Sequence, residues 1–173
     1  ISELLSDYGK VDYLWFDGCG SENHKYDEPR IINVIRTLQP HILIFNMWDP
    51  DTRWVGNEAG VAHSPNKLKV DSIEFSINTD TQDSLGETKF LPAECDCRMR
   101  LENWFFSEND AYTVKTLDEL MGLYYYSVGR GANLLINIGP KPDGTITDEE
   151  TKVLLTMGEW LEINGEGIYA TTF

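Results

Sequence analysis

The chain has 173 residues, of which 41% are hydrophobic and 12% aromatic, and this composition is typical of a folded domain with a sizeable core. The 14 Lys and Arg residues stand against 29 Asp and Glu residues, and the resulting formal charge of -15 argues against nucleic acid or an anionic membrane as partner. Because of this charge we expect a neutral ligand. No apolar run approaches the ~20 residues that span a bilayer, and the N-terminus lacks a signal-peptide pattern.

The first part of the chain alternates helix and strand. Residues 1–9 have helical spacing and end at a glycine, which predicts the last turns of a helix with a glycine cap. Because the chain begins inside this helix without a Met, we expect it to be part of a longer protein. Residues 11–18 (VDYLWFDG) predict a short strand buried on both faces. A helix over 29–39 and a strand over 41–46 complete a βαβ unit with parallel strands.

The middle of the chain is less regular. From residue 47 to residue 86 turn residues recur without periodicity, which predicts a long functional loop. Residues 89–94 are a candidate third strand, and the aromatic, polar segment 103–110 is expected to be another loop. Residues 132–138 are a fourth apolar strand.

Two capping boxes mark the remaining helices. The Thr-x-x-Glu patterns at 116–119 and 147–150 predict helix starts, and an apolar face follows each of them. Gly129 and Gly165 are the expected ends of these helices, and residues 168–173 are a possible strand stub.

The element order predicts the α/β class. About four strands alternate with four helices, which is the content of half of a (β/α)8-type, TIM-like barrel. A half barrel cannot close its sheet, so we expect a missing N-terminal half or a second copy to cover the open edge.

Two acids are candidates for catalysis. Asp17 follows the first strand, at the usual position of active sites in parallel sheets and barrels, although it could equally cap the turn. Glycosidic hydrolysis needs two carboxyl groups, and Glu58, between two glycines, lies in the loop after the next strand. Loops after consecutive parallel strands are neighbours, so the two acids can converge. The alternative is that Glu58 is a solvated loop acid.

Four tryptophans fall at or beyond predicted strand ends: Trp15, Trp48, Trp54 and Trp104. Aromatic rings cover the apolar C–H faces of sugars, but the same rings could simply pack the rim of a barrel. Trp160 has helical spacing and is expected in the core.

The sequence offers no comparable metal or thiol site. Residues 49–51 (DPD) lack the spacing of a calcium loop and predict a plain turn. The three histidines form no spaced pair for zinc. Cys19, Cys95 and Cys97 are expected to be free thiols. We therefore expect no metal or organic cofactor.

Five motifs together resemble the α-L-fucosidases of glycoside hydrolase family 29. They lie at 8–18, at 53–58 (RWVGNE), at 91–96 (LPAECD), at 127–138 and at 158–166. They occur in the family's order and cover almost the whole chain, and the RWVGNE form is similar to the subgroup that acts on α-1,3/1,4-linked fucose.

The resemblance implies a retaining exo-glycosidase that acts on a fucosylated oligosaccharide or glycoconjugate. Asp17 would attack the anomeric carbon, and Glu58 would protonate the leaving oxygen and then deprotonate water. Retention requires the two carboxyl groups to lie ~5–5.5 Å apart. The resemblance also assigns pocket or substrate contacts to Trp15, Trp104, Arg53 and Glu94.

The chain also departs from the family pattern. The family's fucose-binding histidines come from early barrel strands that have no counterpart here, so residues 1–173 resemble the C-terminal half of the catalytic barrel without the β-sandwich that often follows it. Two other readings therefore stay open: a retaining glycosidase of other sugar specificity, and a truncated, non-catalytic or sugar-binding half barrel. The resemblance implies an extracytoplasmic location.

Overall fold

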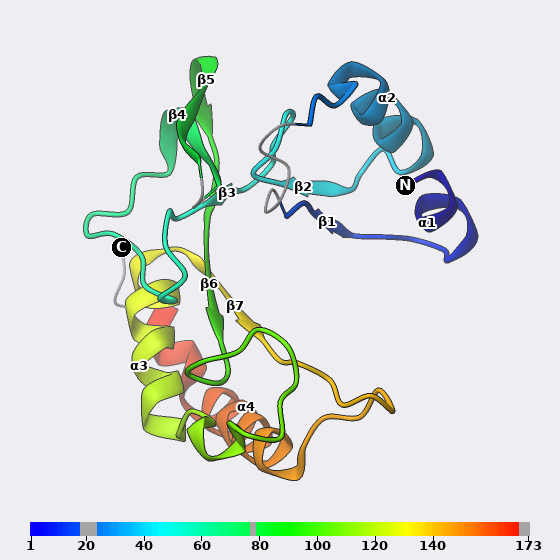
Figure 1. The fold of residues 1–173 in the computed structure, drawn as a ribbon. Coiled ribbons are helices and arrows are strands. Elements are labelled where there is room, and N and C mark those ends of the chain that lie inside the picture. Colours follow the sequence, from blue (N-terminus) through cyan, green and yellow to red (C-terminus); the bar gives the residue numbers. More distant parts are fainter. Residues whose placement is uncertain (18–23, 77–78, 170–173) are drawn as a thin grey trace. The chain divides into compact units, whose positions relative to one another are not determined.

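The computed structural model describes residues 1–17, 24–76 and 79–169 (Figure 1). The chain divides into two compact units, the first formed by residues 1–56 and 67–92 and the second by residues 57–66 and 93–173. Cys19 lies outside the described residues. Within them, every helix is too short or too polar to span a bilayer.

The first unit begins with the predicted βαβ arrangement. Helix α1 (Ser2–Asp7) leads to strand β1 (Tyr13–Trp15), and helix α2 (Glu28–Leu38) connects β1 to strand β2 (Leu43–Phe45). The strands pair in parallel, as predicted, although each is shorter than expected. Gly9 has a φ of +82°, a left-handed conformation that suits the predicted glycine after the first helix.

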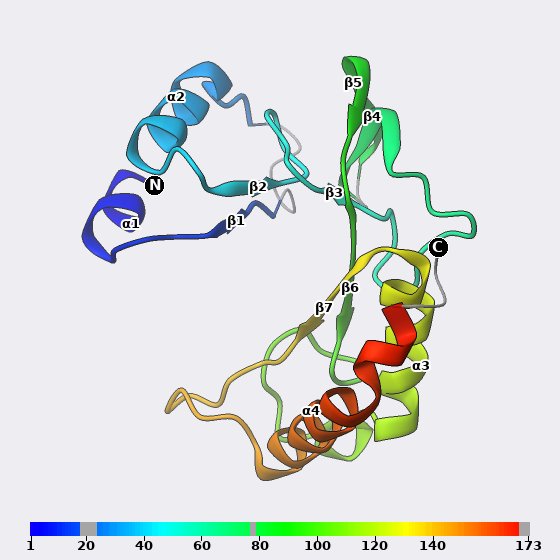
Figure 2. The same ribbon diagram turned by 180° about the vertical axis from the view of Figure 1, so that it is seen from behind.

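Only one face of the β1–β2 pair is buried by helices. Leu14 and Ile44 are paired in register and join a buried cluster with side chains from α1 and α2. On the other face, Trp15 is 39% and Leu43 48% exposed. The prediction of a strand buried on both faces is therefore wrong, because α1 and α2 lie on the same side of the pair (Figures 1 and 2).

The predicted long loop contains strands. Strand β3 (Arg53–Trp54) is followed by β4 (Lys69–Ser76) and β5 (Thr79–Phe90), which pair antiparallel in a hairpin. Register shifts between Val70 and Ser72 and again farther along β4 break the alternation of side chains. A bulged hairpin shows no clean period of two, so the sequence pattern missed it.

The second unit contains a further βαβ arrangement. Strand β6 (Ala93–Arg98) pairs in parallel with β7 (Asn133–Asn137), and helix α3 (Leu117–Ser127) connects them. Helix α4 (Asp148–Tyr169) follows (Figure 2). The predicted strand 89–94 is wrong in its bounds, because the chain leaves β5 before Leu91-Pro92 and β6 begins afterwards.

Methionine and aromatic side chains form the core of this unit. The buried members come from both helices and from the residue that follows β6: Met99, Leu120, Met121, Tyr124 and Met157. Trp160 packs against them, as its helical spacing predicts. With parallel strands and packed helices in both units, the α/β class is confirmed.

The helix starts follow the sequence more closely than the helix ends. Thr116 and Glu119 form the predicted capping box, each binding the backbone N–H of the other. After α3 a 3-10 turn, η2 (Val128–Arg130), leads to Gly131, which has the left-handed φ of +75°. The glycine that ends this region is thus Gly131 and not Gly129.

Helix α4 also continues through Gly165 to Tyr169, so the predicted helix end is wrong, and residues 168 and 169 are helical where the strand stub was expected to begin. The rest of the predicted stub lies outside the described residues. Glycine in a helix costs only about 1 kcal/mol relative to alanine, which is too little to end a helix by itself.

Candidate active site

Asp17 lies in coil two residues beyond the carboxyl end of β1, and it is exposed. Trp15, the last residue of β1, stacks on Phe45, the last residue of β2, with ring centroids 4.6 Å apart and planes 11° apart. The two residues are register partners, which explains the stacking. An aromatic pair therefore lies at the strand ends that precede Asp17.

The loop after β2 has an unusual backbone. Asn46 and Trp48 have left-handed φ angles of 53° and 59°, which non-glycine residues rarely adopt. The Asn46 side chain accepts a hydrogen bond from the backbone N–H of Trp54 at 2.8 Å. The backbone N–H of Asn46 donates to the carbonyl of Thr52 at 3.0 Å. These bonds close the loop on itself.

An arginine from α2 holds the same loop. Arg36 donates through Nε to Asp49 Oδ2 and through Nη2 to Asp51 Oδ2, both at 2.9 Å, and it also binds the carbonyl of Ile42. We call Arg36, Asp49 and Asp51 the Arg36 cluster. The acids raise the pKa of Arg36 against the opposing effect of burial, so the guanidinium stays charged. The DPD segment forms a bend in the loop, and its two ion pairs with Arg36 hold it in place.

Arg53 is buried at the start of β3. Its Nη2 donates to the carbonyl of Lys67 at 2.6 Å and its Nη1 to the carbonyl of Trp54 at 3.3 Å. Backbone carbonyls thus hold the guanidinium in place.

Glu58 is half-buried in a loop that packs against β6. Asn57 shapes this loop: its Oδ1 accepts from the N–H of Ala59 at 3.0 Å, and its Nδ2 donates to Val61 O at 3.1 Å. Gly60 follows with a φ of +71°, and an added Cβ would come within 3.0 Å of Cys97 Sγ. Gly60, the second of the two glycines that flank Glu58, is therefore required by backbone conformation and by close approach to β6.

Glu94 lies near the amino end of β6, and it is only 2% exposed. Its Oε2 accepts a hydrogen bond from Asn133 Nδ2 at 2.7 Å, across the β6–β7 pair. Trp104 lies beyond the carboxyl end of β6, so these two predicted site residues are at opposite ends of the strand.

Trp104 lies in the loop that follows β6. The guanidinium of Arg98 lies 5.6 Å from the centroid of its ring, and Asn137 Nδ2 donates to the Trp104 carbonyl at 2.6 Å. Gly139 approaches the backbone of Phe106 so closely that any Cβ there would collide with it. The loop after β6 is thus fixed to the chain that follows β7.

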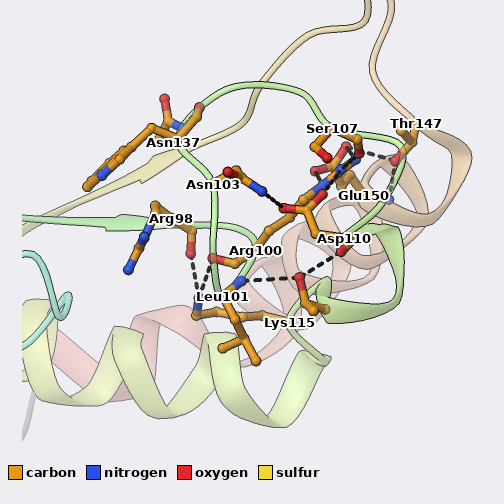
Figure 3. Close-up of polar contacts among 12 residues, drawn as sticks. Arg98, Arg100, Leu101, Asn103, Ser107, Asp110, Lys115, Asn137, Thr147 and Glu150 are labelled. Atoms are coloured by element: carbon orange, nitrogen blue, oxygen red, sulfur yellow. Dashed lines mark hydrogen bonds and ion pairs between the residues drawn. The ribbon is translucent and has the colours of Figure 1, made fainter.

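A buried ionic network holds the rest of this loop (Figure 3). Arg100 donates through Nε to Glu150 Oε1 at 2.8 Å and through Nη1 to Asp110 Oδ1 at 2.7 Å. We call Arg100, Asp110 and Glu150 the Arg100 cluster. The Asp110 carboxylate also accepts from Asn103 Nδ2 at 2.7 Å, and this bond, together with the ion pair, lowers the pKa of Asp110. The three side chains are at most 4% exposed.

The described residues contain two free cysteines, Cys95 and Cys97, both buried. Burial raises the pKa of the Cys97 thiol, so it is in its neutral form. No group of three or more metal-ligating side chains occurs in the described part of the chain.

Sequence reasoning missed the residues that support the site. Arg98 and Arg100 could have been noticed as two arginines just before the aromatic segment 103–110, since guanidinium groups pack on aromatic rings. For Asn46 the local signal is weak: asparagine adopts left-handed φ angles more often than other non-glycine residues. Of the predicted site residues, Trp15, Asp17 and Arg53 belong to the first unit, and Glu58, Glu94 and Trp104 to the second.

The fold and these residues define an α/β protein with acids and aromatic rings at the ends of parallel strands. A sequence model of the family described as alpha-L-fucosidase matches residues 1–166. The chain belongs to this family, glycoside hydrolase family 29.

Individual relatives agree with this assignment. The chain is 33% identical over 169 residues to Alpha-L-fucosidase 1 of Arabidopsis thaliana, covering 92% of this chain and 32% of the relative. It is similar to the structure of a glycoside hydrolase 29 family member from an unknown rumen bacterium, with a TM-score of 0.75, 30% identity and coverage of 91% and 32%. It is also similar to a Ruminococcus gnavus GH29 fucosidase in complex with fucose, with a TM-score of 0.69, 25% identity and coverage of 87% and 33%. The chain spans about a third of the length of these relatives.

Proposed function

We propose that residues 1–173 form the C-terminal half of the (β/α)8-type barrel of a retaining α-L-fucosidase. The observation that carries the proposal is the position of Asp17, just beyond the carboxyl end of a parallel strand, in a chain whose family is α-L-fucosidase. The two βαβ arrangements support the barrel, because such units are what a (β/α)8 barrel repeats.

The proposed reaction is a double displacement. The Asp17 carboxylate attacks the anomeric carbon of the fucosyl unit, and the glycosidic oxygen leaves with a proton from Glu58. Glu58, now ionised, removes a proton from water, and the water oxygen displaces Asp17 to release fucose with retained configuration. Glu58 must therefore begin the cycle protonated and Asp17 ionised. This chemistry requires the two carboxyl groups to lie ~5–5.5 Å apart.

We also propose four substrate contacts: Trp15, Trp104, Arg53 and Glu94. The stacking of Trp15 on Phe45 and of Arg98 on Trp104 supports the first two, since both rings are held in fixed orientations. Family likeness alone supports the other two, and it likewise supports a fucosylated glycan as substrate and an extracytoplasmic location.

Azide distinguishes the two acids in the full-length protein. Asp17→Ala should abolish hydrolysis of an aryl α-L-fucoside, and azide should restore turnover with the inverted β-fucosyl azide as product. Glu58→Ala should also be slow, but azide should attack the covalent intermediate and give the α-fucosyl azide. The matched controls are Asp12→Ala and Glu87→Ala, which remove exposed acids. Unimpaired turnover by either site variant would remove that residue from its role.

Two comparisons test the competing readings. Turnover of aryl α-L-fucoside above that of other aryl glycosides supports the fucosidase. A preference for another sugar would instead support a retaining glycosidase of different specificity on the same fold. The 173-residue chain by itself should show little or no turnover, because the histidines expected in the fucose pocket have no counterpart in it.

A further inference from the structure

A row of aromatic rings lies in the first unit. The rings of Phe16 and Trp48 have centroids 5.1 Å apart, those of Trp48 and Tyr26 5.6 Å, and those of Tyr26 and His24 4.3 Å. Phe16 and Trp48 are half-buried, Tyr26 is 38% exposed and His24 is exposed. We call these four residues the aromatic row, which runs from the core toward solvent.

The aromatic row lies at the carboxyl edge of β1 and β2. Phe16 immediately precedes Asp17, His24 and Tyr26 precede α2, and Trp48 follows β2. Phe16 packs against the core cluster beneath α2, whereas Trp15 packs on Phe45 at the other face of the strands. The row is therefore offset from the Trp15 side of the sheet, and its innermost member, Phe16, directly precedes Asp17 in the chain.

The backbone at Trp48 is costly for a residue of this size. Its φ of 59° is one that bulky side chains avoid, and the Asn46 bond to Trp54 and the Arg36 cluster hold the loop in this shape. Strained backbone of this kind clusters at ligand sites, where the surrounding structure maintains it. The strain keeps a half-exposed indole ring beside Phe16 and Tyr26.

We propose that the aromatic row is a platform for a pyranose unit of the leaving group, the part of the glycan to which the fucosyl unit is attached. The inference rests on the proposed function. Its ligand class follows from the surface: partly exposed rings suit the C–H face of a neutral sugar, and the Tyr26 hydroxyl and His24 imidazole can bind sugar hydroxyls. A chain with a formal charge of -15 also favours a neutral ligand. The row thus acts on the specificity for the leaving group.

The test compares two substrates in the full-length protein. α-L-Fucosyl fluoride has no sugar in its leaving group, whereas a branched oligosaccharide with α-1,3- or α-1,4-linked fucose does. Trp48→Ala and Tyr26→Ala should each lower kcat/KM for the oligosaccharide about tenfold, mainly through KM, and leave fucosyl fluoride within about twofold. Trp48→Phe should retain most of the activity on both, because it keeps an aromatic ring.

Controls separate sugar binding from folding. Trp48→Leu fills space without a flat ring and should behave like Trp48→Ala. Tyr112→Ala removes an 82% exposed tyrosine in the second unit and should leave both substrates unaffected. Equal losses on both substrates, or undiminished turnover of the oligosaccharide, would overturn the proposal.

A binding measurement keeps this test independent of the reaction. If the wild-type protein does not hydrolyse fucosyl fluoride, the proposed function fails, and saturation-transfer NMR with the defucosylated oligosaccharide then decides about the platform. Binding that is lost in Trp48→Ala and kept in Trp48→Phe supports the aromatic row. Binding that is equal in all three proteins, or absent in the wild type, overturns it.

Discussion

The Arg36 cluster and the Arg100 cluster, one in each unit, each contain one arginine and two acids but differ in burial. In each, one arginine holds two carboxylates, and at least one of them lies in the loop that follows a strand. The side chain of Arg36 is 28% exposed and its acids 48% and 33%, whereas the side chain of Arg100 is 4% exposed and its acids 2% and 0%. Water therefore screens the first cluster and is excluded from the second.

This difference determines what each cluster can do. An exposed ion pair contributes little to stability, so the Arg36 cluster mainly orients its loop. A buried charge whose partner is removed is strongly destabilising, so we expect the complete Arg100 cluster to contribute far more to the stability of its unit than the Arg36 cluster does. Both clusters hold loops that carry proposed substrate contacts, but the loss of the buried one should cost its unit more stability.

The largest effect is expected from Arg100→Met. The substitution keeps much of the side-chain volume and leaves two buried carboxylates without their cation, so we expect the free energy of unfolding to fall by about 3–5 kcal/mol. Urea denaturation followed by circular dichroism measures this loss. The matched control Arg130→Met removes a half-buried arginine that binds the Ala62 carbonyl and stacks on Tyr126. A loss for Arg100→Met no larger than the control's would contradict the large cost expected for two buried carboxylates without their cation.

The next effect depends on pH. The pKa of Asp110 is lowered in the folded chain, first by its hydrogen bond from Asn103 and also by Arg100. Its contribution to stability is therefore complete above the unfolded pKa of about 3.9 and is lost as pH falls through the lower, folded pKa. Asp110→Asn should destabilise the chain most near pH 6–7, and the difference from wild type should shrink below about pH 4. A difference that stays constant from pH 7 to pH 3 would contradict the ionised form of Asp110.

The two threonine helix caps also differ in burial. Thr147 Oγ1 donates to Glu150 Oε2 at 2.7 Å inside the Arg100 cluster and accepts from the Glu150 N–H, whereas the box formed by Thr116 and Glu119 is exposed. We expect Thr147→Ala to cost about 1–2 kcal/mol and Thr116→Ala about 0.5–1 kcal/mol. Thermal unfolding of both variants measures the order, and a larger loss at Thr116 would contradict it.

The sequence predicted those features of the fold that depend on residues close together in the chain. The capping box at Thr116, the βαβ order and Gly9 all follow from local patterns of side chains and backbone preference. Glu150 shows the limit of such patterns: the box with Thr147 was visible, but its partner Arg100 lies 50 positions away. A local sequence pattern cannot reveal an ion pair between residues that only the folded chain brings together.

The candidate site shows the same division. The sequence placed Asp17 at a strand end and Glu58 in a glycine-flanked loop, because glycine and strand signals are local. The left-handed backbone at Asn46 and Trp48 depends on bonds that close the loop. Asparagine adopts such φ angles more often than other non-glycine residues, but a tryptophan disfavours them, so the residue types do not predict the pair. The β4–β5 hairpin was missed for a related reason, since its bulges hide the alternation.

The smallest effect is expected from Arg36→Met, and salt sharpens the comparison. Loss of two partly exposed ion pairs should lower the free energy of unfolding by about 0.5–1 kcal/mol. Raising the salt concentration from 0.1 M to 1 M shortens the Debye length from about 10 Å to 3 Å, so most of this loss should disappear. The loss for Arg100→Met should persist at 1 M salt, because ions do not reach a buried cluster. Urea titrations of both variants at both salt concentrations measure this, and an equal salt response would mean that the two clusters share one dielectric environment despite their different exposure.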